Sequence, residues 1–208
     1  MDFLQQTRTA YDTVAVSYAD LLRTHLDGSP HDRAMLNVFA ERVSGPVADI
    51  GCGPGRITGY LHKIGLTTAF GIDLSPEMIA VARRDYPDIG FEVGSMLGLD
   101  LADGSLGGVL AWYSIIHVPP ERHPDVLAEF HRVLAPGGQL LVGFHVGDET
   151  RHIENAYGHD IQLTAYRLRP ERITELLAAA GIPVHSTLIR EPEGLERKPQ
   201  AYLLAQKA

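Results

Sequence analysis

The sequence contains little cysteine and little positive charge. A single cysteine, Cys52, stands among 208 residues, which excludes an intramolecular disulfide and a cysteine-based zinc site and favours a reducing cytoplasm. The formal net charge is −8, so we expect a small-molecule substrate and no nucleic-acid partner, because phosphates require a basic face. A membrane-spanning run of about eighteen apolar residues is also absent. We therefore expect a soluble cytoplasmic protein with no membrane contact.

Three alternating glycines follow a short apolar stretch. Residues 47–50 read as a buried strand, and Gly51, Gly53 and Gly55 come directly after it, before a helical pattern. Glycine has no Cβ and lets a ligand approach the backbone, and the start of a helix directs unpaired N–H groups at that ligand. Asp73 lies where a second strand should end, and its carboxylate suits a ribose. The pattern predicts a turn that holds a nucleotide-type cofactor.

The rest of the chain alternates strands with helices, and its length fits one domain, residues 1–208. Residues 1–45 read as a helical N-terminal cap, and residues 46–146 as a cofactor-binding core in which parallel strands are joined by crossover helices. Residues 170–208 read as a helix followed by two apolar stretches that can pair as an antiparallel hairpin. These patterns predict an α/β fold, a Rossmann-like three-layer sandwich.

Individual elements of the core follow from apolar spacing and turn residues. We expect strands over residues 47–50, 68–72, 91–93, 107–113 and 139–146. One helix should start with Ser75 as its cap and Pro76 at its first position. Another carries the apolar face of Val126 and Leu134, and we expect it to end at residues 136–138, where a glycine can adopt the left-handed stop.

A glycine-rich turn after a strand is used by NAD enzymes, flavoproteins and sulfonium-cofactor enzymes. The dinucleotide motif Gly-x-Gly-x-x-Gly does not fit here, because the third glycine comes one place early and Arg56 occupies the position of the last one. No tyrosine is followed four residues later by a lysine, so a common hydride-transfer pair is also missing. An NAD-dependent oxidoreductase is therefore the less favoured alternative.

Three segments, in this order, resemble the class I S-adenosylmethionine-dependent methyltransferases that act on small molecules. They are residues 49–55, 71–78 and 133–138. The resemblance implies a seven-stranded, mostly parallel sheet whose seventh strand is antiparallel beside the fifth. It implies S-adenosyl-L-methionine as cofactor and transfer of a methyl group to an O or N atom of a small-molecule acceptor.

The same resemblance implies a set of cofactor residues. Asp49 would hold the amino group of the methionine portion, and Asp73 would accept hydrogen bonds from both ribose hydroxyls. Leu74 and Met78 would flank the adenine, and Ser95 stands where the family usually has an acid for the adenine amino group. The expected set is Tyr11, Tyr18, Asp49, Gly51, Cys52, Gly53, Gly55, Asp73, Leu74, Met78, Ser95, Met96 and Tyr113.

Two histidines at expected strand ends are candidate catalytic bases. His117 follows the fourth strand, where ligands bind in open α/β sheets, and its intrinsic pKa suits a general base. The alternative is a histidine bonded to backbone at the start of a helix. His145 ends the fifth strand and could share the cavity or be structural. Tyr11 and Tyr18 would close over the cofactor or be core residues.

Residues 147–169 are too long for a simple connection and are rich in polar and aromatic side chains, which predicts a substrate cap. His145, His152 and His159 are seven residues apart, but no pair of carboxylates supports them, and we expect no metal. A regulatory protein that binds S-adenosylmethionine without turnover remains an alternative function. The chain would act as a monomer or a homodimer.

Overall fold

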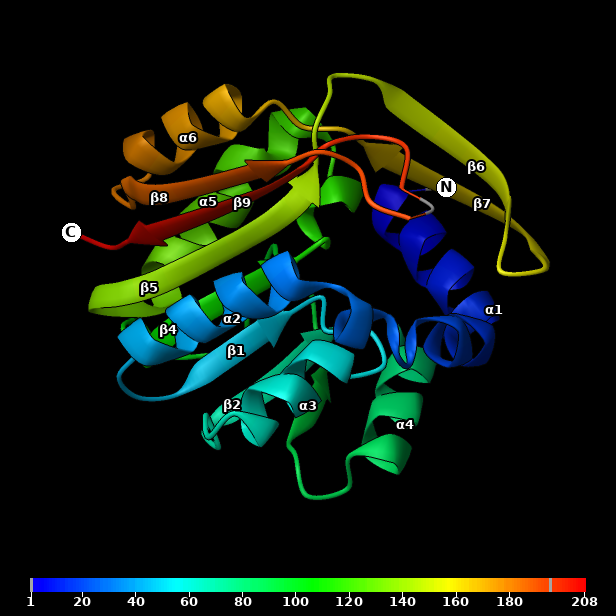
Figure 1. The fold of residues 1–208 in the computed structure, drawn as a ribbon, viewed down its shortest axis with the longest axis horizontal. Coiled ribbons are helices and arrows are strands. Elements are labelled where there is room, and N and C mark those ends of the chain that lie inside the picture. Colours follow the sequence, from blue (N-terminus) through cyan, green and yellow to red (C-terminus); the bar gives the residue numbers. More distant parts are fainter. Residues whose placement is uncertain (1, 195) are drawn as a thin grey trace.

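The protein is described by a computed structural model that covers residues 2–194 and 196–208. Its main sheet has seven strands in the order β3-β2-β1-β4-β5-β9-β8, and β6 and β7 form a separate two-stranded sheet (Figure 1). The strands are β1 Val47–Ile50, β2 Ala69–Asp73, β3 Phe91–Val93, β4 Leu106–Trp112, β5 Leu134–His145, β6 Thr150–Ala156, β7 His159–Tyr166, β8 Val184–Arg190 and β9 Gln200–Gln206. The helices are α1 Phe3–Leu22, η1 His25–Gly28, α2 Pro30–Arg42, α3 Arg56–Lys63, α4 Pro76–Asp85, η2 Ile115–His117, η3 Pro120–Arg122, α5 His123–Val133 and α6 Pro170–Ala179.

The main sheet has the predicted direction of strands. Strands β1 to β5 are mutually parallel, while β9 is antiparallel to both of its neighbours, β5 and β8. The register of the last pairings is fixed by apolar residues that face each other, such as Leu141 opposite Leu204. The prediction of a seven-stranded, mostly parallel sheet with an antiparallel strand beside β5 is therefore confirmed.

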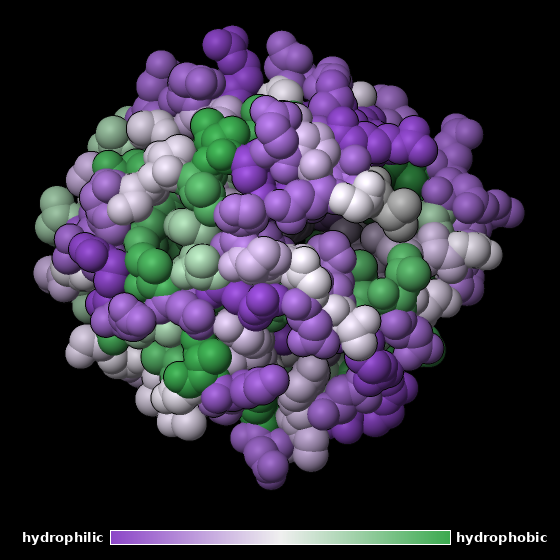
Figure 2. Space-filling model, in the orientation of Figure 1, coloured by the Kyte–Doolittle hydropathy of each residue, from purple (hydrophilic) through white to green (hydrophobic). Residues whose placement is uncertain are grey.

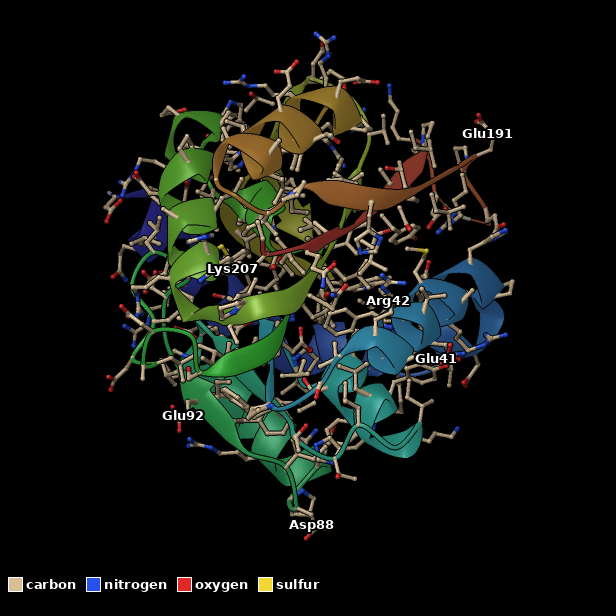
Figure 3. The ribbon with its side chains drawn as sticks, turned by 90° about the vertical axis from the view of Figure 1, so that its left-hand side faces the viewer. Glu41, Arg42, Asp88, Glu92, Glu191 and Lys207 are labelled. Atoms are coloured by element: carbon tan, nitrogen blue, oxygen red, sulfur yellow. The ribbon has the colours of Figure 1, made fainter. Side chains whose placement is uncertain are left out.

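Helices cover both faces of this sheet. Along β4, Val109 and Ala111 pack in the cluster that contains α5 and α6, whereas Leu110 and Trp112 pack in the cluster that contains α2 and α3. Figure 3 shows α5 and α6 on one side of the sheet and α2 and α3 on the other, with labelled charged side chains such as Asp88 and Glu191 pointing outward. Burial on both faces explains why β4 is almost entirely apolar.

Helix α1 does not belong to either layer. Together with β6 and β7 it lies at the end of the sheet toward which β1, β4 and β5 point (Figure 1). Ala10 and Val14 of α1 pack against Met78 of α4 and against Ile161 and Leu163 of β7. We call α1, β6 and β7 the lid. The sequence grouped residues 1–45 as one helical cap, but α2 instead covers the sheet face.

Two expectations about local structure need correction. Helix α5 ends at Val133, not at residues 136–138, because Leu134 already has an extended backbone and pairs with Leu106 of β4. Gly137 has the expected positive φ of 77°, but it lies within β5. Residues 147–169 hold a β-hairpin that the sequence analysis did not predict. Strand β6 is mostly exposed and has no apolar alternation, although in β7 Ile161 and Leu163 alternate with polar residues.

The outer surface is mainly polar. Figure 2 shows hydrophilic residues over most of this face, with hydrophobic ones gathered in separate small clusters. Among the described residues, no helix combines the length and the apolar character that crossing a membrane requires.

Candidate cofactor and acceptor site

The three glycines after β1 serve two different purposes. All three have positive φ, which L side chains rarely adopt. A Cβ at Gly51 would overlap the Cβ of Ser114, and one at Gly55 would lie 2.7 Å from the Phe91 ring. A Cβ at Gly53 would meet nothing closer than 3.9 Å. Gly51 and Gly55 are therefore required by packing, whereas Gly53 exposes backbone to open space.

The carboxylate of Asp73 is fixed against this turn. It accepts hydrogen bonds from the N–H groups of Gly53 (2.8 Å) and Ser75 (2.9 Å). Ser75 caps α4 and Pro76 is its first residue, as the sequence predicted. Burial raises the pKa of Asp73 to about 6, although the two N–H groups oppose the shift. The acid thus sits beside the exposed backbone of Gly53.

Two buried polar atoms near the turn have no partner within the described residues. Asp49 accepts a hydrogen bond from Thr58 (2.7 Å) through Oδ2, but its Oδ1 is unpaired. The Nη1 of Arg56, the first residue of α3, is also buried and unpaired. Burial raises the pKa of Asp49 to about 7. Buried polar groups without partners are uncommon, and these two could pair with an ammonium and a carboxylate of a ligand.

One cavity collects most of the predicted site. Its wall includes every predicted cofactor residue except Gly55, together with the candidate base His117. Sequence reasoning missed Arg56, although its position in the glycine motif had been noted. It also named no site residue in the first two turns of α1, although residues 1–45 were expected to be helical. The missed wall residues are Phe3, Leu4, Thr7, Arg8, Ile50, Pro54, Arg56, Ile57, Ser75, Gly94, Trp112, Ser114 and Val118.

The part of the wall that follows β3 carries no acid. Ser95 and Met96 line the cavity there, and the Ser95 hydroxyl accepts a hydrogen bond from the N–H of Leu97 (3.2 Å). A hydroxyl keeps a further lone pair and its own proton after such a bond. Leu74 and Met78 line the same cavity and supply apolar surface.

His117 is buried and bonded on both ring nitrogens. Its Nδ1 lies 3.0 Å from the carbonyl oxygen of Thr164 in β7, and its Nε2 lies 2.6 Å from the Tyr11 hydroxyl in α1. Burial lowers the pKa of His117 to about 4, so the ring is neutral near pH 7. The structure thus contains the backbone bond of the simpler alternative and, in addition, a bond to a cavity tyrosine.

Tyr113, the residue after β4, has a φ of 55°, which is unusual for a bulky residue. Its hydroxyl lies 2.9 Å from that of Tyr202, which donates a hydrogen bond to the buried Asp32. A carboxylate can only accept, so the chain of donors runs from Tyr113 through Tyr202 to Asp32. Arg190 adds its guanidinium 3.5 Å from Asp32. The Tyr113 hydroxyl therefore has no proton left to donate to a ligand.

His145 does not line the cavity. Its Nδ1 lies 2.8 Å from the amide oxygen of Gln200, and its ring centre lies 4.9 Å from that of Tyr113, which does line it. His152 contacts the Thr164 hydroxyl and His159 contacts Ser17, so the three evenly spaced histidines have separate partners. In the part of the chain that is described, no group of three or more His, Cys, Asp or Glu residues has the arrangement of a metal site.

Solved structures share this fold. The magnesium protoporphyrin IX methyltransferase of Synechocystis, solved with bound S-adenosylmethionine, superposes with a TM-score of 0.75 at 16% identity, covering 100% of this chain and 98% of that one. The 1,6-didemethyltoxoflavin-N1-methyltransferase of Burkholderia thailandensis gives a TM-score of 0.64 at 23% identity, covering 95% and 90%. The architecture is that of the Rossmann-like methyltransferases.

The sequence agrees with this architecture. Residues 47–138 match the family described as "Methyltransferase domain", which supports the predicted resemblance to the class I S-adenosylmethionine-dependent methyltransferases. The demethylmenaquinone methyltransferase of Chlorobaculum parvum is 38% identical over 92 residues, which cover 44% of this chain and 37% of that protein. The matched part thus spans less than two fifths of that relative's length.

Proposed function

We propose that this protein transfers the methyl group of S-adenosylmethionine to an oxygen or nitrogen atom of a small molecule. The observation that supports it most is the cavity beside the glycine turn, whose wall includes Asp73 together with Asp49 and Arg56, each of which has a buried polar atom without a partner among the described residues. Relatives whose names include demethylmenaquinone methyltransferase and didemethyltoxoflavin methyltransferase are consistent with a small acceptor. We place the reaction in the cytoplasm.

The chemistry of the donor set suits this cofactor. Asp49 would bind its α-ammonium, Arg56 its carboxylate and Asp73 its ribose hydroxyls, while Leu74 and Met78 would contact the adenine. The raised pKa values of the two acids, about 7 and about 6, result mainly from burial. A cation beside them would offset that cost, and the cofactor carries positive charge on both nitrogen and sulfur.

When bound, S-adenosylmethionine supplies an electrophilic methyl group on a sulfonium, which is displaced in line by a lone pair of the acceptor. The protein's contribution is then to align the acceptor and to exclude water. The first turns of α1, which line the cavity with Phe3, Leu4 and Thr7, would form part of the acceptor pocket. Residues 147–169, which contact His117 through the Thr164 carbonyl, would cover it as the substrate cap.

Two measurements test the proposal. Calorimetry with S-adenosylhomocysteine should show binding that Asp73→Ala abolishes or strongly weakens. The protein should also transfer label from methyl-labelled S-adenosylmethionine to a small product when it is mixed with a metabolite extract. Binding without any product would support the regulatory alternative, and absence of binding would refute the cofactor site itself.

A further inference from the structure

A hydrogen-bonded chain connects three distant segments at the cavity. The Tyr11 hydroxyl comes from α1, the His117 ring from η2 and the Thr164 carbonyl from β7. Tyr11 and His117 are 106 positions apart in the sequence and both line the cavity. Their rings meet edge to face, with centres 5.2 Å apart. The lid is therefore joined to the site through the side chain of His117.

The partners of His117 determine where each proton lies. The Thr164 carbonyl oxygen can only accept, so Nδ1 carries the ring proton and donates it at 3.0 Å. In a neutral imidazole the other nitrogen, Nε2, then has a lone pair and no proton. The short 2.6 Å contact requires a donor, and Tyr11 supplies it with its O–H. Burial keeps the ring neutral by lowering its pKa to about 4.

This direction changes which side chain can meet the acceptor. The Nε2 lone pair of His117 is covered by Tyr11, so the imidazole is not free to touch a substrate proton. Tyr11 donates its only O–H proton in the hydrogen bond to His117, and its oxygen keeps lone pairs that an acceptor can use. Burial raises the pKa of Tyr11 well above its usual value, so its own proton stays in place until another proton replaces it.

We propose, building on the methyltransferase function above, that the Tyr11 oxygen is the catalytic group that takes the acceptor's proton while its own O–H proton passes to Nε2 of His117. The acceptor's O–H or N–H bond breaks as its bond to the methyl carbon forms, and the electron pair of the broken C–S bond stays on sulfur. His117 ends as an imidazolium that still donates from Nδ1 to Thr164. Charge is balanced, because the cationic sulfonium becomes a neutral thioether.

The weak basicity of His117 is compatible with this role. Methyl transfer to a neutral hydroxyl would leave a positively charged, protonated ether, which is a far stronger acid than an imidazolium. Proton removal during transfer avoids that intermediate, so a neutral imidazole with a low pKa suffices. Once the product leaves and water enters, the imidazolium returns its proton to solvent.

The same direction of hydrogen bonds selects the class of acceptor. Tyr113 also donates its proton away from the cavity, toward Tyr202 and Asp32. Neither phenol therefore has a proton to donate to the acceptor, and the lone pairs of the Tyr11 oxygen suit a hydroxyl or an N–H group. A carboxylate acceptor offers only lone pairs, which the lone pairs of the Tyr11 oxygen would repel, and it has no proton that Tyr11 could take. The acceptor is thus a neutral hydroxyl compound or one with a weakly basic N–H group, and the product a methyl ether or an N-methyl compound, not a methyl ester.

Three variants separate proton transfer from simple docking of the lid. Tyr11→Phe removes the hydroxyl. His117→Gln places an amide oxygen near the position of Nε2, so it can still accept from Tyr11 but cannot take up a proton at neutral pH. Ser17→Ala is the matched control, because it breaks another hydroxyl-to-imidazole contact between α1 and β7, the 2.9 Å contact with His159, and Ser17 does not line the cavity.

The experiment uses the full chain with methyl-labelled S-adenosylmethionine and the metabolite extract. Tyr11→Phe and His117→Gln should each lower the rate of label transfer by about 100-fold or more, with S-adenosylhomocysteine affinity close to that of the parent protein. Ser17→Ala should remain within about 2-fold. The labelled product should resist mild alkali, which would release labelled methanol from a methyl ester.

A second readout does not depend on turnover. In protein with ¹⁵N-labelled histidine, the His117 signal, identified by its loss in His117→Gln, should be that of a neutral ring protonated on Nδ1. Tyr11→Phe should shift the Nε2 resonance. A ring protonated on Nε2, an alkali-labile product, or turnover of Tyr11→Phe or His117→Gln at the Ser17→Ala rate would each overturn the inference. If the parent protein does not bind S-adenosylhomocysteine at all, the proposed function is refuted instead.

Discussion

The cavity has two walls that are built in different ways. The cofactor wall, residues 49–56 and 73–78, consists of turns at the ends of β1 and β2 and is held by backbone hydrogen bonds such as Gly51 N–H to Ile72 carbonyl, 2.7 Å. The lid reaches the cavity through single side chains, such as Tyr11 on His117 at 2.6 Å. The first wall is fixed by the sheet, whereas the second depends on contacts between segments far apart in the chain.

This difference separates the part of the protein that specifies the cofactor from the part that specifies the acceptor. A wall made of backbone is rigid and tolerates few substitutions, which suits a cofactor of constant structure. A lid joined by individual hydroxyl and imidazole groups can change its side chains without disturbing the sheet. We expect substitutions in the first wall to affect stability and cofactor affinity, and those in the second to affect turnover.

The largest effect should come from Gly51→Ala. Its Cβ would overlap that of Ser114, and its φ of 76° is strained for alanine. Overpacking and left-handed strain together should lower the free energy of unfolding by about 3 kcal/mol. A Cβ at Gly53 would meet open space, so Gly53→Ala should lower the free energy of unfolding by only about 1 to 2 kcal/mol. It should, however, bind S-adenosylhomocysteine more weakly. Urea unfolding of both variants tests this, and equal losses would contradict the distinction between the two glycines.

Next in size is the effect of Arg56→Met on cofactor affinity. If Nη1 of Arg56 binds the cofactor carboxylate, removing the guanidinium should lower the affinity for S-adenosylhomocysteine by about 30-fold, because losing one partner of a buried charge pair costs about 2 kcal/mol or more. Methylthioadenosine lacks both the carboxylate and the ammonium and serves as the matched ligand. Its affinity should not change, and calorimetry that found equal losses for the two ligands would refute the assignment.

Much of the cofactor wall was predictable from the sequence, and little of the lid was. Gly51, Gly53 and Asp73 are recognisable because turn geometry and strand ends require particular residue types within a short window. The partner of Tyr11 is 106 positions away in the sequence. His117 is oriented by a backbone carbonyl, which any residue type can supply, so the sequence does not reveal this contact. Strand β6 leaves little trace in the sequence because it has no buried side chain, whereas the alternation of Ile161 and Leu163 with polar residues in β7 was a signal that could have been read.

A smaller effect should appear in the pH dependence of cofactor binding. Burial raises the pKa of Asp49 to about 7, and only the carboxylate form attracts an ammonium. Lowering the pH protonates Asp49, so S-adenosylhomocysteine affinity should fall by about tenfold from pH 8 to pH 6. Asp49→Asn should bind weakly at both pH values, with a much smaller change. A parent affinity that does not change over this range would show that Asp49 does not hold the ammonium.

The smallest effect is expected where the two walls are joined. Asp12 of α1 accepts a hydrogen bond from the hydroxyl of Ser75 (2.6 Å) and a longer one from the N–H of Glu77 (3.3 Å), both at the start of α4. Its side chain is 30% exposed, so Asp12→Ala should reduce the free energy of unfolding by only about 1 kcal/mol.

This junction tests whether the lid and the cofactor wall are independent. The Ser75 hydroxyl, which caps α4, also accepts a hydrogen bond from the N–H of Met78 (3.1 Å), and this bond does not require Asp12. If the cofactor wall is held by the sheet alone, Asp12→Ala should leave S-adenosylhomocysteine affinity within about 2-fold while hydrogen exchange in α1 becomes faster. A larger loss of affinity, at unchanged exchange in α1, would mean that Asp12 orders the cofactor wall itself, because α4 would then depend on a residue of the lid for its position.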